Sequence, residues 1–235
     1  MLNIKSFVFN PFQTSCPLLW DEDGCGVIVD PGCYGEVEMQ RLCSYMAAEK
    51  IRPEKILLTH GHFDHIYGVK ALSELYDIPV YMHPDDAVIL AHDDQISTAF
   101  GLKAPDTSFD WLPLSEGDIL RGGKISFEVI HTPGHTPGGV CFLDREDGLL
   151  LSGDTLFAGS IGRTDNQWGD YDKLIVSIMD KLMGLPSDTD VIPGHGPKTD
   201  IGYERTHNPF LQPFNEPEES ADEDPDGIGL DGSWI

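Results

Sequence analysis

The stretch LLTHGHFDHIYG, residues 57–68, sets three histidines and an aspartate directly behind an apolar run: His60, His62, Asp64 and His65. In a helix, residues i and i+2 point about 200° apart around the axis, so His60 and His62 could not bind one ion there. In an extended chain they share a face. We therefore predict a buried strand over 55–60 that presents four ligand-type side chains at its end, as a metal site requires.

Three more ligand-type residues stand next to glycine at the ends of later predicted strands: His135 in HTPGHTPGG, Asp154 in LLSGDTLF and His195 in VIPGHGP. Glycine lets the backbone approach an ion closely. Five histidines and two aspartates exceed the need of one tetrahedral ion, and they suit two ions about 3.5–4 Å apart that share a carboxylate and a water. The sequence predicts two divalent ions, with zinc favoured and iron or manganese as alternatives.

The remaining histidines lack this context, and we expect them to be structural or surface residues: His83, His92, His131 and His207. Motifs of other chemistries are missing from the sequence, which has no G-x-S-x-G, no P-loop lysine motif and no G-x-G-x-x-G behind a strand. The five cysteines are odd in number and include no C-x-x-C, which favours reduced thiols and a cytoplasmic location.

The charge balance restricts the partners. With 15 Lys and Arg against 40 Asp and Glu, the net charge is -25, which would repel a nucleic acid backbone. No run of 18 or more apolar residues and no apolar signal segment occurs, so we expect no membrane association. A small-molecule substrate is the expected partner, and the sequence leaves the oligomeric state open.

The chain divides into two predicted parts, a catalytic domain over 1–212 and an acidic C-terminal tail over 213–235, whose last 20 residues hold no Lys or Arg. Within the domain, hydrophobic patterns predict helices over 35–49, 68–76, 85–92 and 171–183, and a loop over 93–110 that covers a site. Predicted strands cover 4–9, 16–20, 26–30, 55–60, 80–83, 124–132, 138–144, 148–154 and 190–194. This alternation predicts an α/β fold in which two packed sheets are covered by helices on both outer faces.

Four motifs, THGHFDH, TPGHTPGG, SGDTLF and PGHGP, resemble those of the metallo-β-lactamase superfamily in order and spacing. The resemblance extends over residues 1 to about 210. It implies an αββα sandwich of two mixed β-sheets flanked by helices, with the site at one edge between the sheets.

The resemblance also implies roles for individual residues. His60, His62 and His135 would hold the first metal, Asp64, His65 and His195 the second, and Asp154 would bridge the two. Asp30 of VIVDPG matches a position that usually orients the ligands from behind, although it could equally be a turn aspartate that ends a strand.

Within the superfamily, GDTLFAGSIGRTD and ERTHNPFL resemble short glyoxalase II-like hydrolases, which cleave the thioester S-lactoylglutathione. The resemblance implies attack by a metal-bound hydroxide, with Asp64 orienting the water and Asp154 completing the catalytic pair. A thiolate leaves without a general acid, and none is apparent. GHGPKT replaces the family's GHEYT-like segment, and an acidic tail stands in place of a basic helical domain, so glutathione recognition is left open. The nearest basic candidates for an anionic substrate are Lys198 and Arg205, while Arg163 is expected to brace its loop.

Two alternatives follow from the same motifs. Persulfide dioxygenases are similar, including GRTD at 162–165, but use one iron held by two histidines and an aspartate, here His60, His135 and Asp154. Non-catalytic scaffold or sensor members usually lose ligands, whereas all seven positions are filled here.

Overall fold

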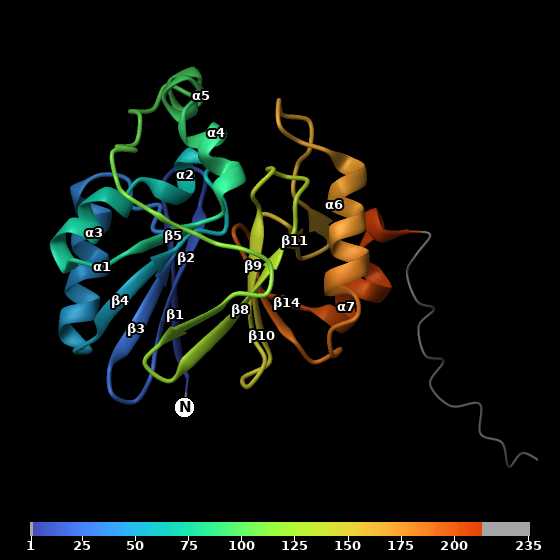
Figure 1. The fold of residues 1–235 in the computed structure, drawn as a ribbon, viewed down its shortest axis with the longest axis horizontal. Coiled ribbons are helices and arrows are strands. Elements are labelled where there is room, and N and C mark those ends of the chain that lie inside the picture. Colours follow the sequence, from blue (N-terminus) through green and yellow to red (C-terminus); the bar gives the residue numbers. More distant parts are fainter. Residues whose placement is uncertain (1, 213–235) are drawn as a thin grey trace, which may run out of the picture.

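Two six-stranded sheets form the middle of the computed structural model, which describes residues 2–212 (Figure 1). The first sheet has the order β1-β2-β3-β4-β5-β6 and the second the order β14-β13-β10-β9-β8-β7. The first contains β1 (Asn3–Phe9), β2 (Thr14–Trp20), β3 (Cys25–Val29), β4 (Arg52–Leu57), β5 (Val80–Met82) and β6 (Leu112–Pro113). The second contains β7 (Ile119–Gly122), β8 (Ile125–His131), β9 (Val140–Asp144), β10 (Leu149–Gly153), β13 (Asp190–Pro193) and β14 (Thr199–Asp200), and a separate hairpin pairs β11 (Leu156–Phe157) with β12 (Ser160–Ile161).

Both sheets are mixed. Strands β1, β2 and β3 pair antiparallel, whereas β3, β4, β5 and β6 pair parallel. In the second sheet β10 pairs parallel with β13 and the other pairs are antiparallel. Strands that run in one direction end at the same edge of a sheet, so the segments that follow β8, β10 and β13 can meet at one edge of the second sheet.

Helices cover the outer face of each sheet (Figure 1). The helix α1 (Glu36–Ala48) and α3 (Val69–Tyr76) lie on the first sheet, and α6 (Tyr171–Ser177) and α7 (Ile201–His207) lie on the second. Shorter elements are α2 (Phe63–Ile66), η1 (Pro84–Asp86), α4 (Ala87–Leu90), α5 (Asp93–Ala99), the π-helical turn η2 (Ile178–Leu182) and η3 (Pro209–Leu211). The layer order is therefore helix, sheet, sheet, helix, as predicted.

Alternation along the strands explains the three-layered core. In β4, Ile56 packs with the helices of its own sheet, whereas the next residue, Leu57, packs between the sheets. In β10, Leu151 belongs to the core between the sheets and Leu150 packs against α6. Strands buried on both faces need apolar residues at consecutive positions, which is why ILL at 56–58 and LLL at 149–151 are unbroken apolar runs.

The helix after β12 was predicted well. Asp170 accepts a hydrogen bond from the Lys173 amide and caps the N-terminus of α6. Leu174, Ile178 and Leu182 are fully buried in the hydrophobic cluster between the second sheet and its helices. The apolar face of the helix predicted over 171–183 is therefore the face that packs on the second sheet.

Two expectations for the region between β5 and β6 were wrong. Residues 85–92 do not form one helix, because η1 ends at Asp86 and α4 covers only 87–90. Residues 93–110 are not entirely a loop, because α5 occupies 93–99. Its helical period is hidden by polar residues on the inner side, where Ser97 is buried and donates to the Asp93 carbonyl.

The acidic tail predicted for 213–235 lies outside the described residues. Within 2–212, no helix has both the length and the apolar character needed to cross a bilayer.

Candidate metal centre

All seven predicted ligand residues come together where the two sheets meet. His60 and His62 follow β4, and α2 carries Asp64 and His65 one turn later. His135, Asp154 and His195 come from the other sheet, after β8, β10 and β13. Backbone hydrogen bonds from Val140 to Thr59 and from Ser15 to Gly194 join the two halves here. Each half of the fold thus supplies part of one cluster.

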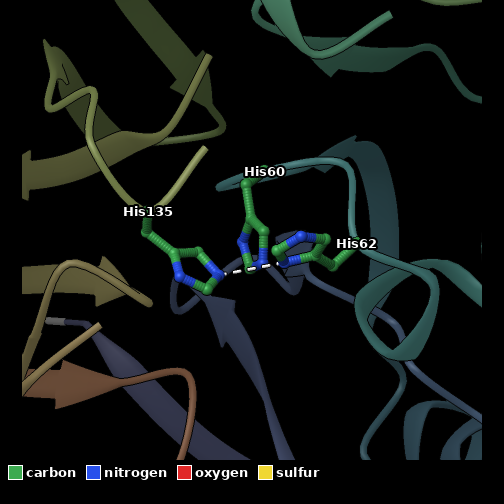
Figure 2. A group of neighbouring side chains, drawn as sticks. All are labelled: His60, His62 and His135. Atoms are coloured by element: carbon green, nitrogen blue, oxygen red, sulfur yellow. Dashed lines mark hydrogen bonds between the residues drawn. The ribbon is translucent and has the colours of Figure 1, made fainter. Parts of the chain in front are cut away.

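The first group contains His60, His62 and His135, whose nitrogens lie within 4.8 Å of one another (Figure 2). His135 Nε2 is 2.9 Å from His62 Nδ1. Figure 2 shows the three rings pointing toward a common space from two chain segments. Two ligand atoms on one tetrahedral ion at about 2.0–2.1 Å stand roughly 3.3 Å apart, so this spacing is close to that of a shared ion.

The second group contains Asp64, His65 and His195, with Asp154 beside both groups. Asp154 Oδ2 is 3.5 Å from His135 Nε2 and 3.4 Å from His195 Nε2, while its Oδ1 is 3.5 Å from His65 Nε2. Asp64 Oδ2 is 3.4 Å from His195 Nε2. Asp154 is therefore placed between the groups, as a bridging carboxylate would be.

The other ring nitrogen of most of these histidines is held by an acceptor. Nδ1 of His65 lies 3.0 Å from Asp30 Oδ2, Nδ1 of His135 lies 2.7 Å from the Arg163 carbonyl, and Nδ1 of His195 lies 3.0 Å from the Phe12 carbonyl. Because a carbonyl or carboxylate oxygen accepts, each Nδ1 donates, and in the neutral form of each ring it is Nε2 that carries a lone pair toward the cluster.

The histidines of the cluster differ in the direction in which their surroundings shift the pKa. Burial lowers the pKa of His62 to about 3 and takes the pKa of His60 well below its usual value, so these rings are neutral at pH 7. Burial acts in the same direction on His65 and His195, but the neighbouring carboxylates outweigh it and raise their pKa to about 9 and about 11. The carboxylates of Asp64 and Asp154 stay ionised.

Two buried atoms of the cluster, His60 Nε2 and Asp154 Oδ1, have no hydrogen-bond partner among the described residues. A buried acceptor without a partner costs about 1–3 kcal/mol, and more when it is charged. A divalent cation in this space would give both atoms a partner and offset the carboxylate charge. The donor set of imidazole and carboxylate therefore fits metal ions such as zinc, iron or manganese.

Asp30 lies behind the cluster and does more than end a strand. Its Oδ1 accepts from the Thr59 amide at 2.8 Å, and its Oδ2 accepts from the Thr59 hydroxyl at 2.6 Å and from His65. Thr59 Oγ1 in turn lies 3.1 Å from His60 Nδ1. Asp30 thus contacts one candidate ligand directly and a second through Thr59, in agreement with the orienting role that the resemblance implied.

Two further polar residues were missed by the sequence analysis. Thr14, which is fully buried, donates from Oγ1 to Asp64 Oδ2 at 2.7 Å. Asp86, also fully buried, accepts from the Gly61 amide, the Thr136 hydroxyl and the Gly138 amide at 2.8, 2.9 and 2.6 Å. Asp86 therefore ties the loop of His60 and His62 to the loop of His135.

A pocket of about 620 Å³ opens beside the cluster and includes His62, Asp64, His135, Asp154 and His195 in its lining. Its remaining walls are mostly apolar and come from the loop after β1, from α2, from α5 with the residue after it, and from the segment 157–168. The prediction that the region after 93 covers a site agrees with this lining.

Two expectations about single residues were wrong, and two others fit the structure. His92 lines the pocket with its ring centroid 5.2 Å from that of Trp168, a packing contact that fits the structural role expected for it. Arg205 donates to the carbonyls of Met183 and Leu185, and neither Arg205 nor Lys198 lines the pocket. Arg163 does line it and pairs with Asp165 at 2.8 Å, which fits the bracing role.

A smaller group of ligand-type residues, His83, Asp85 and His131, lies outside the pocket. The two rings stack at 4.0 Å with an angle of 11° between their planes. Lone pairs of stacked parallel rings run side by side and do not converge on an ion. This agrees with the structural or surface role expected for both histidines.

Comparison with known proteins places this geometry in context. Residues 9–195 match the family model of the metallo-beta-lactamase superfamily. Hydroxyacylglutathione hydrolase GloC of Haemophilus influenzae is 38% identical over 216 residues, which cover 89% of this chain and 98% of GloC.

Two solved structures also match over most of the chain. The structure of the BLEG-1 B3 metallo-beta-lactamase superposes with a TM-score of 0.83 at 39% identity, covering 89% of this chain and 100% of that one. The di-iron-bound form of TTHA1623 gives 0.80 at 40% identity, covering 88% and 100%.

Proposed function

The chain belongs to the metallo-beta-lactamase superfamily, and from that premise we propose that this metal-dependent hydrolase cleaves thioesters, as glyoxalase II does. We further propose that His60, His62 and His135 hold one divalent ion, that Asp64, His65 and His195 hold a second, and that Asp154 bridges them. The identity with a protein named hydroxyacylglutathione hydrolase supports the reaction class.

The observation that carries this proposal is the position of Asp154 between the two histidine groups, at the floor of a pocket large enough for a substrate. A carboxylate within 3.5 Å of three ligand-type nitrogens, with one buried oxygen that accepts no hydrogen bond, suits a bridge between two ions. The di-iron form of a relative at 40% identity supports the same ion count.

When bound, such ions lower the pKa of a coordinated water and polarise the carbonyl of the substrate. The residues of this chain supply orientation. Asp64, held by Thr14, accepts a hydrogen bond from the attacking water and directs its lone pair at the carbonyl carbon. The new C–O bond forms, the C–S bond breaks, and the thiolate takes up the released proton.

The leaving group decides between a thioester and an amide. A nitrogen leaving group requires a positioned acid, whereas a thiolate is weakly basic and leaves without one. Among the described residues that line the pocket there is no Lys and no Tyr, and its two carboxyl groups, Asp64 and Asp154, have a pKa below the usual range. His92, the one lining histidine outside the ligand set, donates from Nδ1 to the Val88 carbonyl at 2.8 Å, so its neutral ring has no proton on Nε2 to give to a leaving group. The pocket therefore suits a thioester better than an amide.

Persulfide oxidation at one iron is the competing proposal. It would use His60, His135 and Asp154 and would leave the second group of ligand-type residues without a role. The close approach of Asp64, His65 and His195 favours two ions. Lactam hydrolysis is a third reaction to test, since the BLEG-1 relative bears a β-lactamase name.

The test combines metal analysis with four substrates. Purified protein loaded with zinc, iron or manganese is assayed with S-lactoylglutathione, an uncharged thioester, a β-lactam, and glutathione persulfide under oxygen. We expect about two ions per chain and thioester turnover that His62→Ala and chelation abolish, while His207→Ala, on the exposed end of α7, retains it. One iron per chain with oxygen consumption, or equal thioester rates for His62→Ala and the unaltered protein, would refute the proposal.

A further inference from the structure

One wall of the pocket is a cluster of three phenylalanines that are distant in sequence. The ring centroid of Phe12 is 5.2 Å from those of Phe63 and Phe100, both in edge-on arrangement, and Phe63 and Phe100 are 5.9 Å apart. Phe63 is 4% exposed, whereas Phe100, which follows α5, leaves 54% of its surface to solvent. An exposed ring at the end of an aromatic cluster is available to pack against a ligand.

More apolar surface continues around the same pocket. Trp168 packs against His92, and Phe157 lies with its ring centroid 6.2 Å from that of the candidate ligand His195. Ile96 and Ile161 complete this surface. The aromatic and aliphatic wall thus reaches the cluster itself, so a substrate with its carbonyl at the ions would have its substituent against these side chains.

A scarcity of positively charged side chains is the second feature of the pocket lining. Apart from the five candidate ligands in the lining, the described lining residues include one permanently charged side chain, Arg163, and its Nε is paired with Asp165. Glutathione brings two carboxylates, and a single arginine that already pairs with an aspartate is a weak anchor for both. Lys198 and Arg205 stand elsewhere, and the net charge of -25 opposes an anion further.

We propose that this site selects uncharged thioesters that carry an apolar ring, in preference to S-lactoylglutathione. This inference rests on the thioester hydrolysis proposed above. The ring packs against Phe100 and Trp168, while the carbonyl lies at the ligand cluster. Burying apolar substituents of this size changes kcat/KM by about tenfold or more.

The test is a panel of four thioesters that separates the ring from the charge. Lactoyl and phenyllactoyl groups are each joined to glutathione and to uncharged N-acetylcysteamine, and kcat/KM is measured with the metal-loaded full chain. We expect the phenyl ring to raise kcat/KM about tenfold with either thiol, and the change from glutathione to N-acetylcysteamine not to lower it.

Phe100→Ala is the diagnostic variant, because its side chain is largely exposed and its loss should leave the fold intact. It should remove the gain from the ring, whereas Phe210→Ala, a phenylalanine 44% exposed and outside the pocket, should keep it. A higher kcat/KM for S-lactoylglutathione than for both phenyl compounds, or an equal loss on all four with Phe100→Ala, overturns the inference. If none of the four thioesters is hydrolysed, thioester hydrolysis itself is overturned.

Discussion

Asp86 accepts a hydrogen bond at 2.8 Å from the amide of Gly61, the residue between the two histidines of the first ligand pair. The same carboxylate accepts from Thr136 and Gly138 beside His135. A side chain that is no candidate ligand therefore sets the distance between two loops whose ligands must meet within a few ångströms.

Replacing Asp86 should loosen both loops together. Asp86→Ala leaves three buried donors without an acceptor, and we expect a loss of about 2–4 kcal/mol in the free energy of unfolding of the metal-free protein, measured in urea. Asp86→Asn keeps one carbonyl acceptor and should lose less. Asp85→Ala, at the neighbouring exposed position, is the control and should unfold like the unaltered protein. Unchanged midpoints for both Asp86 variants would contradict the role.

Asp30 should act on ion affinity through His65. Its φ of 45° is left-handed, which asparagine tolerates better than alanine, so Asp30→Asn is the fair variant. Loss of the carboxylate behind a ligand histidine weakens metal binding by about 10- to 100-fold. Competition with a chromogenic chelator measures this affinity. Asp144→Asn alters an equally buried turn carboxylate and should bind ions normally, and equal affinities for the two variants would refute the assignment.

Thr14→Val should lower kcat with little change in KM. The substitution keeps the shape of a fully buried side chain and removes the donor to Asp64 Oδ2. We expect kcat with a thioester to fall about tenfold at saturating metal, because Asp64 loses the bond that orients it. Thr132→Val removes a buried hydroxyl that bonds Thr155 instead, and its effect should appear in stability alone. If both valine variants have the same kcat, Thr14 has no positioning role.

Gly194→Ala tests how tightly the strand end after β13 fits the cluster. A Cβ at this position would overlap Asp154 Oδ1 and approach His65 Cε1 at 2.9 Å, so either a ligand or the backbone must shift. We expect fewer bound ions per chain by elemental analysis and at least tenfold lower thioester turnover. Gly184→Ala meets open space and should bind ions normally. Full occupancy in Gly194→Ala would show that the site tolerates the displacement.

Most of the strands and candidate ligands could be predicted from the spacing of residues close together in the sequence. The alternation in KILLTH and the i, i+2, i+4, i+5 pattern of the histidine stretch place four side chains at one strand end, since the period of a strand is fixed. Glycine at later strand ends identified the other three. These signals depend on a few neighbouring residues and on no tertiary contact.

The remaining features depend on packing between distant segments. Asp85 and Asp86 are adjacent aspartates, and one is exposed while the other braces two loops, a difference set by the chain that folds over it. The meeting of Phe12 with Phe100 follows from packing between distant loops of the first half, and the contact of Trp168 with His92 follows from the docking of the two halves. Arg205 was a reasonable anion-binding candidate by charge, but its guanidinium is occupied by the carbonyls of Met183 and Leu185.

The division of the ligand set between the two sheets makes occupancy a measure of how the halves are docked. Four of the seven side chains follow β4, and three follow strands of the other sheet. A small rotation of one sheet against the other would move the ligands of each ion apart before it exposed much of the apolar core. Ion release would then precede unfolding on heating, and the temperature gap between the two events would report the stiffness of the sheet interface.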